Sequence, residues 1–251
     1  MVMPISPQEL KDTTDWVKKI ESTIDDDIPP AMNRGTPRGG YYSSIRLIFC
    51  YVDVFGALMT NTTENSSLNA VKFIKVYFKK VNPRYNDIAG ILYSIFRHGA
   101  VHTFQPKLLF INGRRYGYVI GKDTDVIPNT DSCDFIYKKE ENGDGCTYKH
   151  LEPKSPDPSW PKAMENPGGQ LFPISLEKLL KDLKSAVAYY IDDLENGPDI
   201  QLKENAIGMM RKIHTPTEFS LDNNLVVERH PNLRRGEEFR RYIDPTELSK
   251  F

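Results

Sequence analysis

The chain has 251 residues, of which 39% are hydrophobic and 27% are charged, and its formal net charge is −1. This hydrophobic content is enough for a substantial core and excludes a globally disordered chain. The near-neutral charge excludes a general basic field for nucleic acids, so any contact with a polyanion must be local.

The N-terminal residues, MVMPISPQELKD, lack the basic region and following apolar region of a secretory signal. We also expect no run of the roughly 18 apolar residues that a membrane span needs. The sequence therefore predicts a cytoplasmic protein with no membrane contact. Cys50, Cys133 and Cys146 have no paired spacing and are expected to be reduced, with Cys50 as a small core residue. A disulfide between Cys133 and Cys146, across a turn, is the alternative.

The first 105 residues predict consecutive helices joined by short loops. A helix over 6–24 is expected to stop at an acidic run and at Pro29-Pro30. The segment 41–60 is apolar nearly all round, which favours a helix at the centre of a bundle. The next helix covers 67–80, and a further one ends at residues 97–102. Short loops between such helices imply an antiparallel bundle.

The helix over 67–80 is expected to be amphipathic, with a solvated lysine face. The side chains expected to point inward are Leu68, Val71, Ile74, Val76 and Phe78. The lysines expected on the polar face are Lys72, Lys75, Lys79 and Lys80.

Strand patterns follow after Pro106. Asn112-Gly113 lies between two β-rich runs, which is a strong signal for a hairpin, and a second short hairpin is expected around 142–145. Residues 152–173 are rich in proline and glycine and predict an irregular surface loop. Ser175 is expected to cap an amphipathic helix that runs to about residue 195.

The final third adds a helix over about 199–214 and a charged tail from 225 that is expected to be loosely ordered or to wrap the body. The predicted fold class is α+β and mainly α: an antiparallel helical bundle with an inserted β-hairpin or small antiparallel sheet. We expect a single domain over 1–251, with a bundle over about 6–105 completed by helices 175–214, and a β insertion over about 107–151.

Reactive side chains crowd the end of one predicted helix, in the sequence Arg97-His98-Gly-Ala-Val-His102. Arginine is a permanent cation, and histidine exchanges a proton near neutral pH. An arginine followed by a polar residue and, four to six residues on, by a histidine resembles the motif of the HEPN superfamily. The resemblance covers about residues 41–105. This chain has His98 where that family usually has asparagine, and the β insertion is not a general family feature.

The resemblance implies a helical, dimeric protein whose active relatives are metal-independent endoribonucleases. On that basis Arg97 would hold a phosphate, His102 would act as general acid and base, and His98 would add a hydrogen-bond donor. The implied partners are RNA and a second copy of the chain, and no cofactor is expected. Along an ideal helix, five residues turn by about 140°, so Arg97 and His102 share a face only if the helix loosens near Gly99 or a second subunit completes the site.

A structural interpretation of the same motif stays open: Arg97 pairs with a carboxylate of the bundle, and His102 bonds the last carbonyls of its helix. Asp53 is the expected partner, because it interrupts an apolar run where an unpaired charge is costly. The protein would then be a non-catalytic helical interaction protein, such as a homodimer. Whichever interpretation holds, we predict that Asp53 contacts Arg97 or a histidine of the motif.

Two weaker patterns remain as alternatives. His98 and His102 are four residues apart, at a spacing that suits zinc, but Arg97 opposes a dication and no third ligand is identifiable, so no metal is expected. Arg114-Arg115, followed by Tyr116 and Tyr118, can clamp single-stranded RNA on a hairpin, or can simply form a solvated turn and a packed sheet face.

Overall fold

The computed structural model of the protein describes residues 5–32, 40–98, 109–111, 114–121, 137–139, 146–148, 170–214, 218–222, 225–229 and 239–242. The helical elements are α1 (Pro7–Met32), α2 (Tyr41–Thr60), α3 (Ser66–Phe73), the π-helical turn η1 (Ile74–Phe78), α4 (Lys79–Val81), α5 (Arg84–Tyr93), the π-helical turn η2 (Ser94–His98), α7 (Leu176–Glu195) and α8 (Ile200–His214). The α-rich character expected from the sequence is confirmed.

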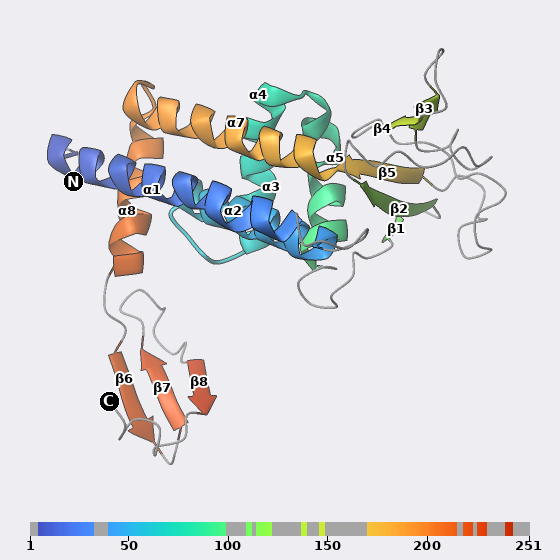
Figure 1. Cartoon of the computed structure of the whole chain (residues 1–251). Coiled ribbons are helices and arrows are strands. Elements are labelled where there is room, and N and C mark those ends of the chain that lie inside the picture. The colour runs from blue at the N-terminus through green and yellow to red at the C-terminus, as the bar shows by residue number, and fades with distance from the viewer. Residues whose placement is uncertain are drawn as a thin grey trace.

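Helix α2 lies at the centre of the helical body and packs against α1, α3, α7 and α8 (Figure 1). Its ring at Phe55 stacks on Phe73 of α3 and meets Tyr190 of α7 edge-on, at centroid distances of 5.6 and 5.9 Å. All three side chains are fully buried. Aromatic pairs in such geometries add to the stabilisation from buried area, so this cluster joins three helices into one core.

Helices α2 and α3 approach each other most closely at Gly56. A Cβ atom on Gly56 would lie 2.7 Å from the carbonyl carbon of Asn69 and 2.8 Å from the amide nitrogen of Ala70. The Asn69 side chain also fastens the connecting loop, because its amide donates to the carbonyls of Thr62 and Glu64 at 2.9 Å. Only a residue without a side chain permits this backbone contact.

Helix α8 closes the C-terminal end of α2. Asn61 ends α2 in the left-handed conformation, with φ 57°. Two side chains of α8 donate hydrogen bonds to backbone carbonyls at this end of α2. The Asn205 amide donates to the carbonyl of Met59 at 2.8 Å, and the Lys212 ammonium donates to the carbonyl of Asn61 at 2.5 Å. The carbonyls at a helix end lack partners within the helix, so these bonds tie the last turn of α2 to α8.

Helix α1 continues beyond its predicted end near residue 24. Pro29 and Pro30 lie inside the helix, although neither has the amide hydrogen that would bond the carbonyls of Asp25 and Asp26. Both aspartates are exposed, so water can bond these carbonyls instead. Three apolar side chains of this last stretch are buried: Ile28, Ala31 and Met32. Core packing outweighs the helix-breaking tendency of the two prolines, and the prediction of an earlier stop was wrong.

A polar contact also holds this end of α1 to α2. The Tyr51 hydroxyl donates to the Asp27 carboxylate at 2.6 Å and lies 2.7 Å from the Thr23 hydroxyl. Burial, followed by the hydrogen bond to Asp27, raises the pKa of Tyr51 to about 12. The phenol therefore stays protonated and donates at all physiological pH values.

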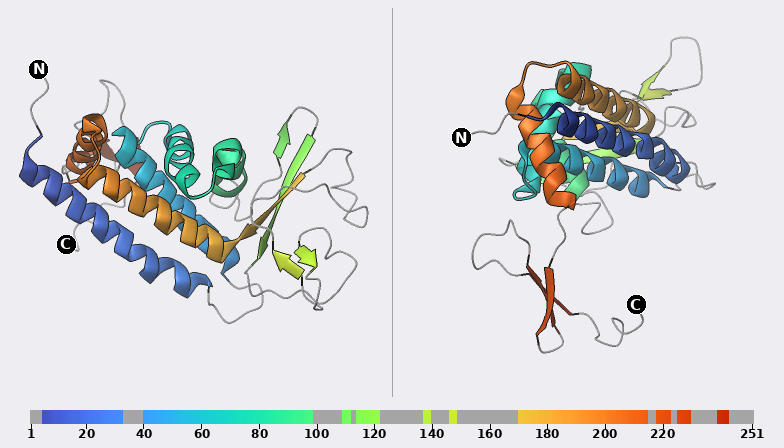
Figure 2. Two further views of the ribbon diagram at one scale, coloured as in Figure 1. Left: turned by 90° about the horizontal axis from the view of Figure 1, so that it is seen from above. Right: turned by 90° about the vertical axis from the view of Figure 1, so that its left-hand side faces the viewer.

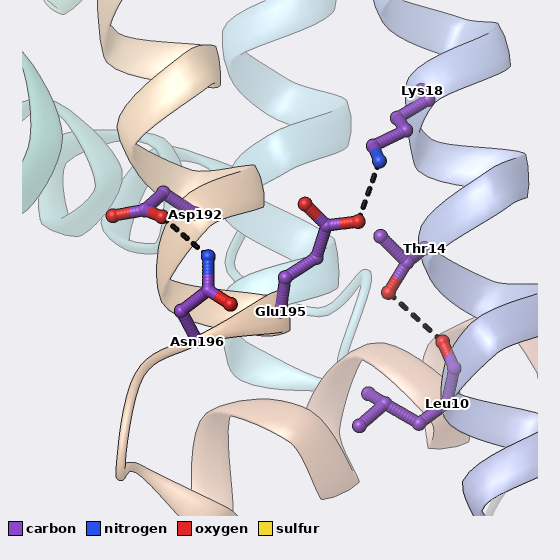
Figure 3. Close-up of polar contacts among 6 residues, drawn as sticks. All are labelled: Leu10, Thr14, Lys18, Asp192, Glu195 and Asn196. Carbon is purple, nitrogen blue, oxygen red and sulfur yellow. Dashed lines mark hydrogen bonds and ion pairs between the residues drawn. The ribbon is translucent and has the colours of Figure 1, made fainter.

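Helices α1 and α7 lie side by side (Figure 2, left) and are joined at their surface by ion pairs. Figure 3 shows the Lys18 ammonium of α1 bonded to the Glu195 carboxylate of α7 at 2.5 Å. The hydrogen bond to Glu195 raises the pKa of Lys18. Both groups are exposed, so this contact between the middle of α1 and the end of α7 contributes little to the stability of the fold.

The buried faces of α3 and η1 differ from the expected ones. The expected inward residues Leu68 and Val76 are 68% and 39% exposed. Positions 74, 76 and 78 are spaced by two residues, and residues at that spacing cannot share one face of a helix. The buried residues follow spacings of three and four instead: Ala70, Phe73, Ile74, Tyr77 and Phe78.

One helix of the described part, α2, is long and apolar enough to cross a membrane by length and composition alone. This finding corrects the expectation that no run would reach such a length. In the fold, 56% of this apolar stretch is buried, and a core helix has the same composition. The helix therefore gives only weak evidence for a membrane span.

The strands form three sheets. The first has the order β1 (Leu109–Ile111), β2 (Arg114–Gly121) and β5 (Gln170–Ser175); the second pairs β3 (Tyr137–Lys139) with β4 (Cys146–Tyr148); the third has the order β6 (Glu218–Asp222), β7 (Leu225–Arg229) and β8 (Phe239–Tyr242).

The sheet β1–β2–β5 is mixed, whereas an antiparallel insertion was expected. Strand β1 pairs antiparallel with β2, with Ile111 opposite Arg114, and the turn residues between them lie outside the described residues. Strand β5 pairs parallel with β2, from Tyr116–Gln170 to Gly121–Ser175. Residues 170–173, expected in the Pro-rich loop, therefore belong to a strand. Part of the tail expected to be loosely ordered likewise forms β7 and β8.

Strand β5 leads directly into α7. Ser175 caps this helix by accepting a hydrogen bond from the amide of Lys178 at 3.2 Å, as the sequence predicts. The sheet lies at the N-terminal end of α7 (Figure 2, left). This arrangement fixes the start of α7 between the sheet and the helical core.

A comparison of two buried tyrosines gives a test of this core. The Tyr190 hydroxyl has no hydrogen-bond partner in the described part of the chain, and burial raises its pKa well above the ordinary value. The Tyr85 hydroxyl donates to Asp182 at 2.7 Å. Because an unpaired buried hydroxyl is costly, Tyr190→Phe is expected to raise the free energy of unfolding by about 1 kcal/mol, whereas Tyr85→Phe is expected to lower it by about 1 kcal/mol. Urea unfolding measures both, and a loss of stability on Tyr190→Phe would contradict the first expectation.

Candidate functional site

Arg97 is positioned by the π-helical turn η2 at the end of α5. The two preceding residues, Ile95 and Phe96, are fully buried, and Phe96 stacks on Phe49 of α2 at a centroid distance of 5.9 Å. This stack fixes the turn against α2. A π turn bonds residues five apart; it occurs mostly as a single widened turn inside an α-helix and is frequent at functional sites. The helix therefore departs from α geometry over Ser94–His98, whereas the expected loosening near Gly99 lies outside the described residues.

The predicted contact between Asp53 and Arg97 is confirmed. The Arg97 Nε donates to Asp53 Oδ2 at 2.5 Å, and the two side chains are 21% and 16% exposed. Asp53 is on α2, forty-four positions before Arg97, so the pair joins the central helix to the end of α5. A charge-assisted bond of this kind is stronger than a bond between neutral groups.

Tyr93 completes the site and was not identified from the sequence. Its hydroxyl donates to Asp53 Oδ1 at 2.7 Å, so both oxygens of the carboxylate are bonded. Ser66, at the start of α3, lies close enough to this hydroxyl to oppose part of its pKa shift. Burial, then the bond to Asp53, raises the pKa of Tyr93 well above its ordinary value. Tyr93 precedes Arg97 by four residues, one helical turn, and this spacing was the signal that could have revealed it.

The guanidinium of Arg97 has a hydrogen bond to the described residues through its Nε atom. Its Nε is bonded to Asp53, while its Nη1 is buried and has no hydrogen-bond partner among the described residues. Burial alone lowers the pKa of Arg97, but the hydrogen bond and charge of Asp53 outweigh this effect and the net shift is upward. Arg97 is therefore a fixed cation, 21% exposed, with a buried donor that no described residue uses. An oxyanion that reaches this guanidinium would meet donors arranged in a planar fork.

The pair is partly exposed: the side chains of Arg97 and Asp53 are 21% and 16% exposed. Cys50, one turn before Asp53 on α2, is exposed, which corrects its expected place in the core. Val54, the residue after Asp53, is 37% exposed. The surrounding protein still displaces part of the water near the Cys50 thiol, and this desolvation raises its pKa although the charge of Arg97 opposes the shift.

The structure does not test the predicted positions of the two histidine side chains of the motif. The backbone of His98 lies in η2, and its side chain, like the whole of His102, is outside the described residues. The predicted meeting of Arg97 with these imidazoles stays a prediction. The described part of the chain contains no group of three or more His, Cys, Asp or Glu residues that can hold a metal ion.

The basic pair that was expected on a hairpin lies on strand β2. Arg114 is opposite Ile111 and Arg115 is opposite Phe110, while Tyr116 begins the parallel pairing with β5. Their side chains are outside the described residues, so a clamp for RNA at this place stays a prediction.

No protein-family model matches this chain, and the comparisons with curated proteins and with solved structures give no significant match. The resemblance to the HEPN motif is thus carried by residues 97–102 themselves.

Proposed function

We propose that the protein is HEPN-like and that it binds RNA at Arg97 and cleaves it with His102. The observation that supports this proposal is the state of Arg97: a fixed cation, aligned by Asp53 and Tyr93, with a donor that no described residue uses. A group that is oriented in advance stabilises charge without having to reorganise during the reaction.

The chemistry follows from these groups without a metal ion. His102 takes the proton of a ribose 2′-hydroxyl, and the 2′-oxygen attacks the adjacent phosphorus. The bond from phosphorus to the 5′-oxygen breaks, and that oxygen takes up the proton that His102 had accepted, so the products are a 2′,3′-cyclic phosphate and a 5′-hydroxyl. Arg97 neutralises the charge that gathers on the phosphate oxygens, and His98 adds a donor. General acid–base catalysis of this kind contributes on the order of 10²–10⁴-fold.

The same proposal includes the finer features of the fold and its setting. We infer one domain, in which the helical bundle is completed by α7 and α8 and the β segments between η2 and α7 are an insertion. The protein acts as a homodimer in the cytoplasm, and the second copy can supply the imidazole that an ideal helix would turn away from Arg97.

The decisive experiment is incubation with mixed RNA in the presence of EDTA. We expect the wild type to cleave and His102→Ala and Arg97→Ala to lose activity by about a hundredfold or more. His214→Ala is the matched control, because His214 is a histidine of α8 whose ring meets Trp16 at 5.5 Å. Equal cleavage by the wild type and His102→Ala, or none by the wild type, would remove the enzymatic proposal.

One observation favours a second function from another class. The bond of Arg97 to Asp53 links α2 to the end of α5, which is what a structural ion pair does. In that case the protein is a non-catalytic helical interaction protein, such as a homodimer. It would then show no cleavage, and Arg97→Ala would lower stability without affecting RNA.

A further inference from the structure

We propose that the exposed lysine row of α3, η1 and α4, together with Tyr189 of α7, binds single-stranded RNA and delivers it to the site. The lysine row is defined here as Lys72, Lys75 and Lys79. This inference rests on the proposed function, because it names a second surface for the same ligand.

The charge of this segment is unlike that of the whole chain. From residue 65 to residue 86 there is no Asp or Glu, although the chain as a whole has 34 acidic and 33 basic residues. The basic residues of this stretch are Lys72, Lys75, Lys79, Lys80 and Arg84. Such a concentration gives a local positive potential on a protein whose net charge is −1.

The lysine row is exposed and available. Its members are spaced by three and four residues, so they lie on one face of the helix, and all three are exposed. No ion pair joins them to a carboxylate in the described part of the chain. Lys80, by contrast, is bonded to Asp193 of α7 at 2.7 Å. Three unpaired ammonium groups in a row are suited to successive phosphates of one strand.

An exposed aromatic ring lies next to Lys80, the residue that follows the last lysine of the row. Tyr189 is 44% exposed, and the Lys80 ammonium is 5.6 Å from the centre of its ring. Val76, one turn before Lys80, is 39% exposed. A base can stack on an exposed tyrosine ring only when it is unpaired, so this combination favours a single strand over a duplex and over an acidic protein surface.

One end of the lysine row is nearer to the candidate site than the other. Helix α3 packs against α5, and its first residue, Ser66, lies close to the Tyr93 hydroxyl, which donates to Asp53. Lys72 follows Ser66 by six residues, about 9 Å along a helix. The Lys72 end of the row is therefore the end nearer to the candidate site.

The test measures binding separately from cleavage, with a fluorescein-labelled 2′-O-methyl single-stranded RNA of about 20 nucleotides, which has no 2′-hydroxyl to react. The triple variant Lys72→Gln, Lys75→Gln, Lys79→Gln is compared with a matched triple variant of exposed lysines on α1 and α7: Lys11→Gln, Lys19→Gln, Lys181→Gln. We expect the lysine-row variant to bind the probe at least about tenfold more weakly than the wild type at low salt. The plot of log affinity against log salt concentration should also become less steep, by about 2. The matched variant is expected to keep the wild-type slope.

A second pair of variants tests the ring. Tyr189→Ala is expected to weaken binding by about tenfold, and Tyr189→Phe to preserve it, because stacking needs the ring and not the hydroxyl. Circular dichroism confirms that each variant is folded.

The outcomes separate this inference from the proposed function. If the wild type binds RNA and the lysine-row variant has the same affinity and slope, the inference is overturned and cleavage at Arg97 is untouched. If cleavage is absent but the lysine row still governs binding, the enzymatic proposal fails and this inference stands. Equal binding of poly-glutamate would indicate an acidic protein partner and would overturn the assignment to RNA, as would a failure of the wild type to bind the probe.

Discussion

Replacing Asp53 by alanine is expected to lower the free energy of unfolding by about 2–3 kcal/mol, because it leaves the guanidinium of Arg97 partly buried without its counter-charge. The same change removes the acceptor of the Tyr93 hydroxyl. The estimate lies at or below the lower end of the range for fully buried pairs, since the two charged side chains are 21% and 16% exposed. Urea unfolding followed by circular dichroism measures the change.

The control for this prediction is Asp25→Ala. Asp25 also forms an ion pair, with Lys184 of α7 at 2.7 Å, but the two side chains are 55% and 43% exposed. Exposed pairs contribute about 0–1 kcal/mol, so this variant should be close to the wild type. A double variant, Asp53→Ala with Arg97→Leu, should recover part of the lost stability because no unpaired charge remains. Equal effects of Asp53→Ala and Asp25→Ala would show that the pair at the site contributes no more than a surface contact.

Gly56→Ala is expected to destabilise the protein by about 2–3 kcal/mol, because the new methyl group must push α2 and α3 apart. Its Cβ would meet backbone atoms of Asn69 and Ala70 at 2.7–2.8 Å, and backbone atoms cannot swing aside as a flexible side chain can. The displaced α3 also carries Phe73, which stacks on Phe55. Thermal unfolding gives the change in melting temperature.

Gly90→Ala is the matched control for the same chemical change. Gly90 lies within α5 and is exposed, and an added Cβ meets nothing within 4 Å. Alanine has the higher helix propensity, so this variant is expected to gain about 0.5–1 kcal/mol. If Gly56→Ala and Gly90→Ala change the stability in the same direction, the close contact of α2 with α3 does not explain the glycine at position 56.

The helices could be predicted from the sequence where the local pattern and the tertiary packing agree. In α7, Ser175 supplies the cap and the apolar residues recur at helical spacing, so the predicted helix matches the observed one closely. The end of α1 could not be predicted, because it is decided by the burial of Ile28, Ala31 and Met32 in the folded core, which the local sequence does not reveal. Local propensity favours a stop at Pro29, and the core overrides it.

The candidate site could be predicted in part for a similar reason. Asp53 was found because it interrupts an apolar run, where an unpaired carboxylate is costly, and because the arginine of the motif was expected to pair with a carboxylate of the bundle. Tyr93 was missed, because a tyrosine in an apolar stretch looks like ordinary core until a second helix brings Asp53 to its hydroxyl. Widened turns such as η1 and η2 have no composition by which a sequence reveals them.

Those two widened turns have a consequence for tracing the ancestry of this protein. Each accommodates one residue more than an ordinary turn, at Ile74–Phe78 and at Ser94–His98. A homologue that lost a single codon there would keep its helices while shifting the distance between Asp53 and Arg97 in the chain by one. An alignment that forbids a one-residue gap inside these helices would place the wrong residue opposite Arg97.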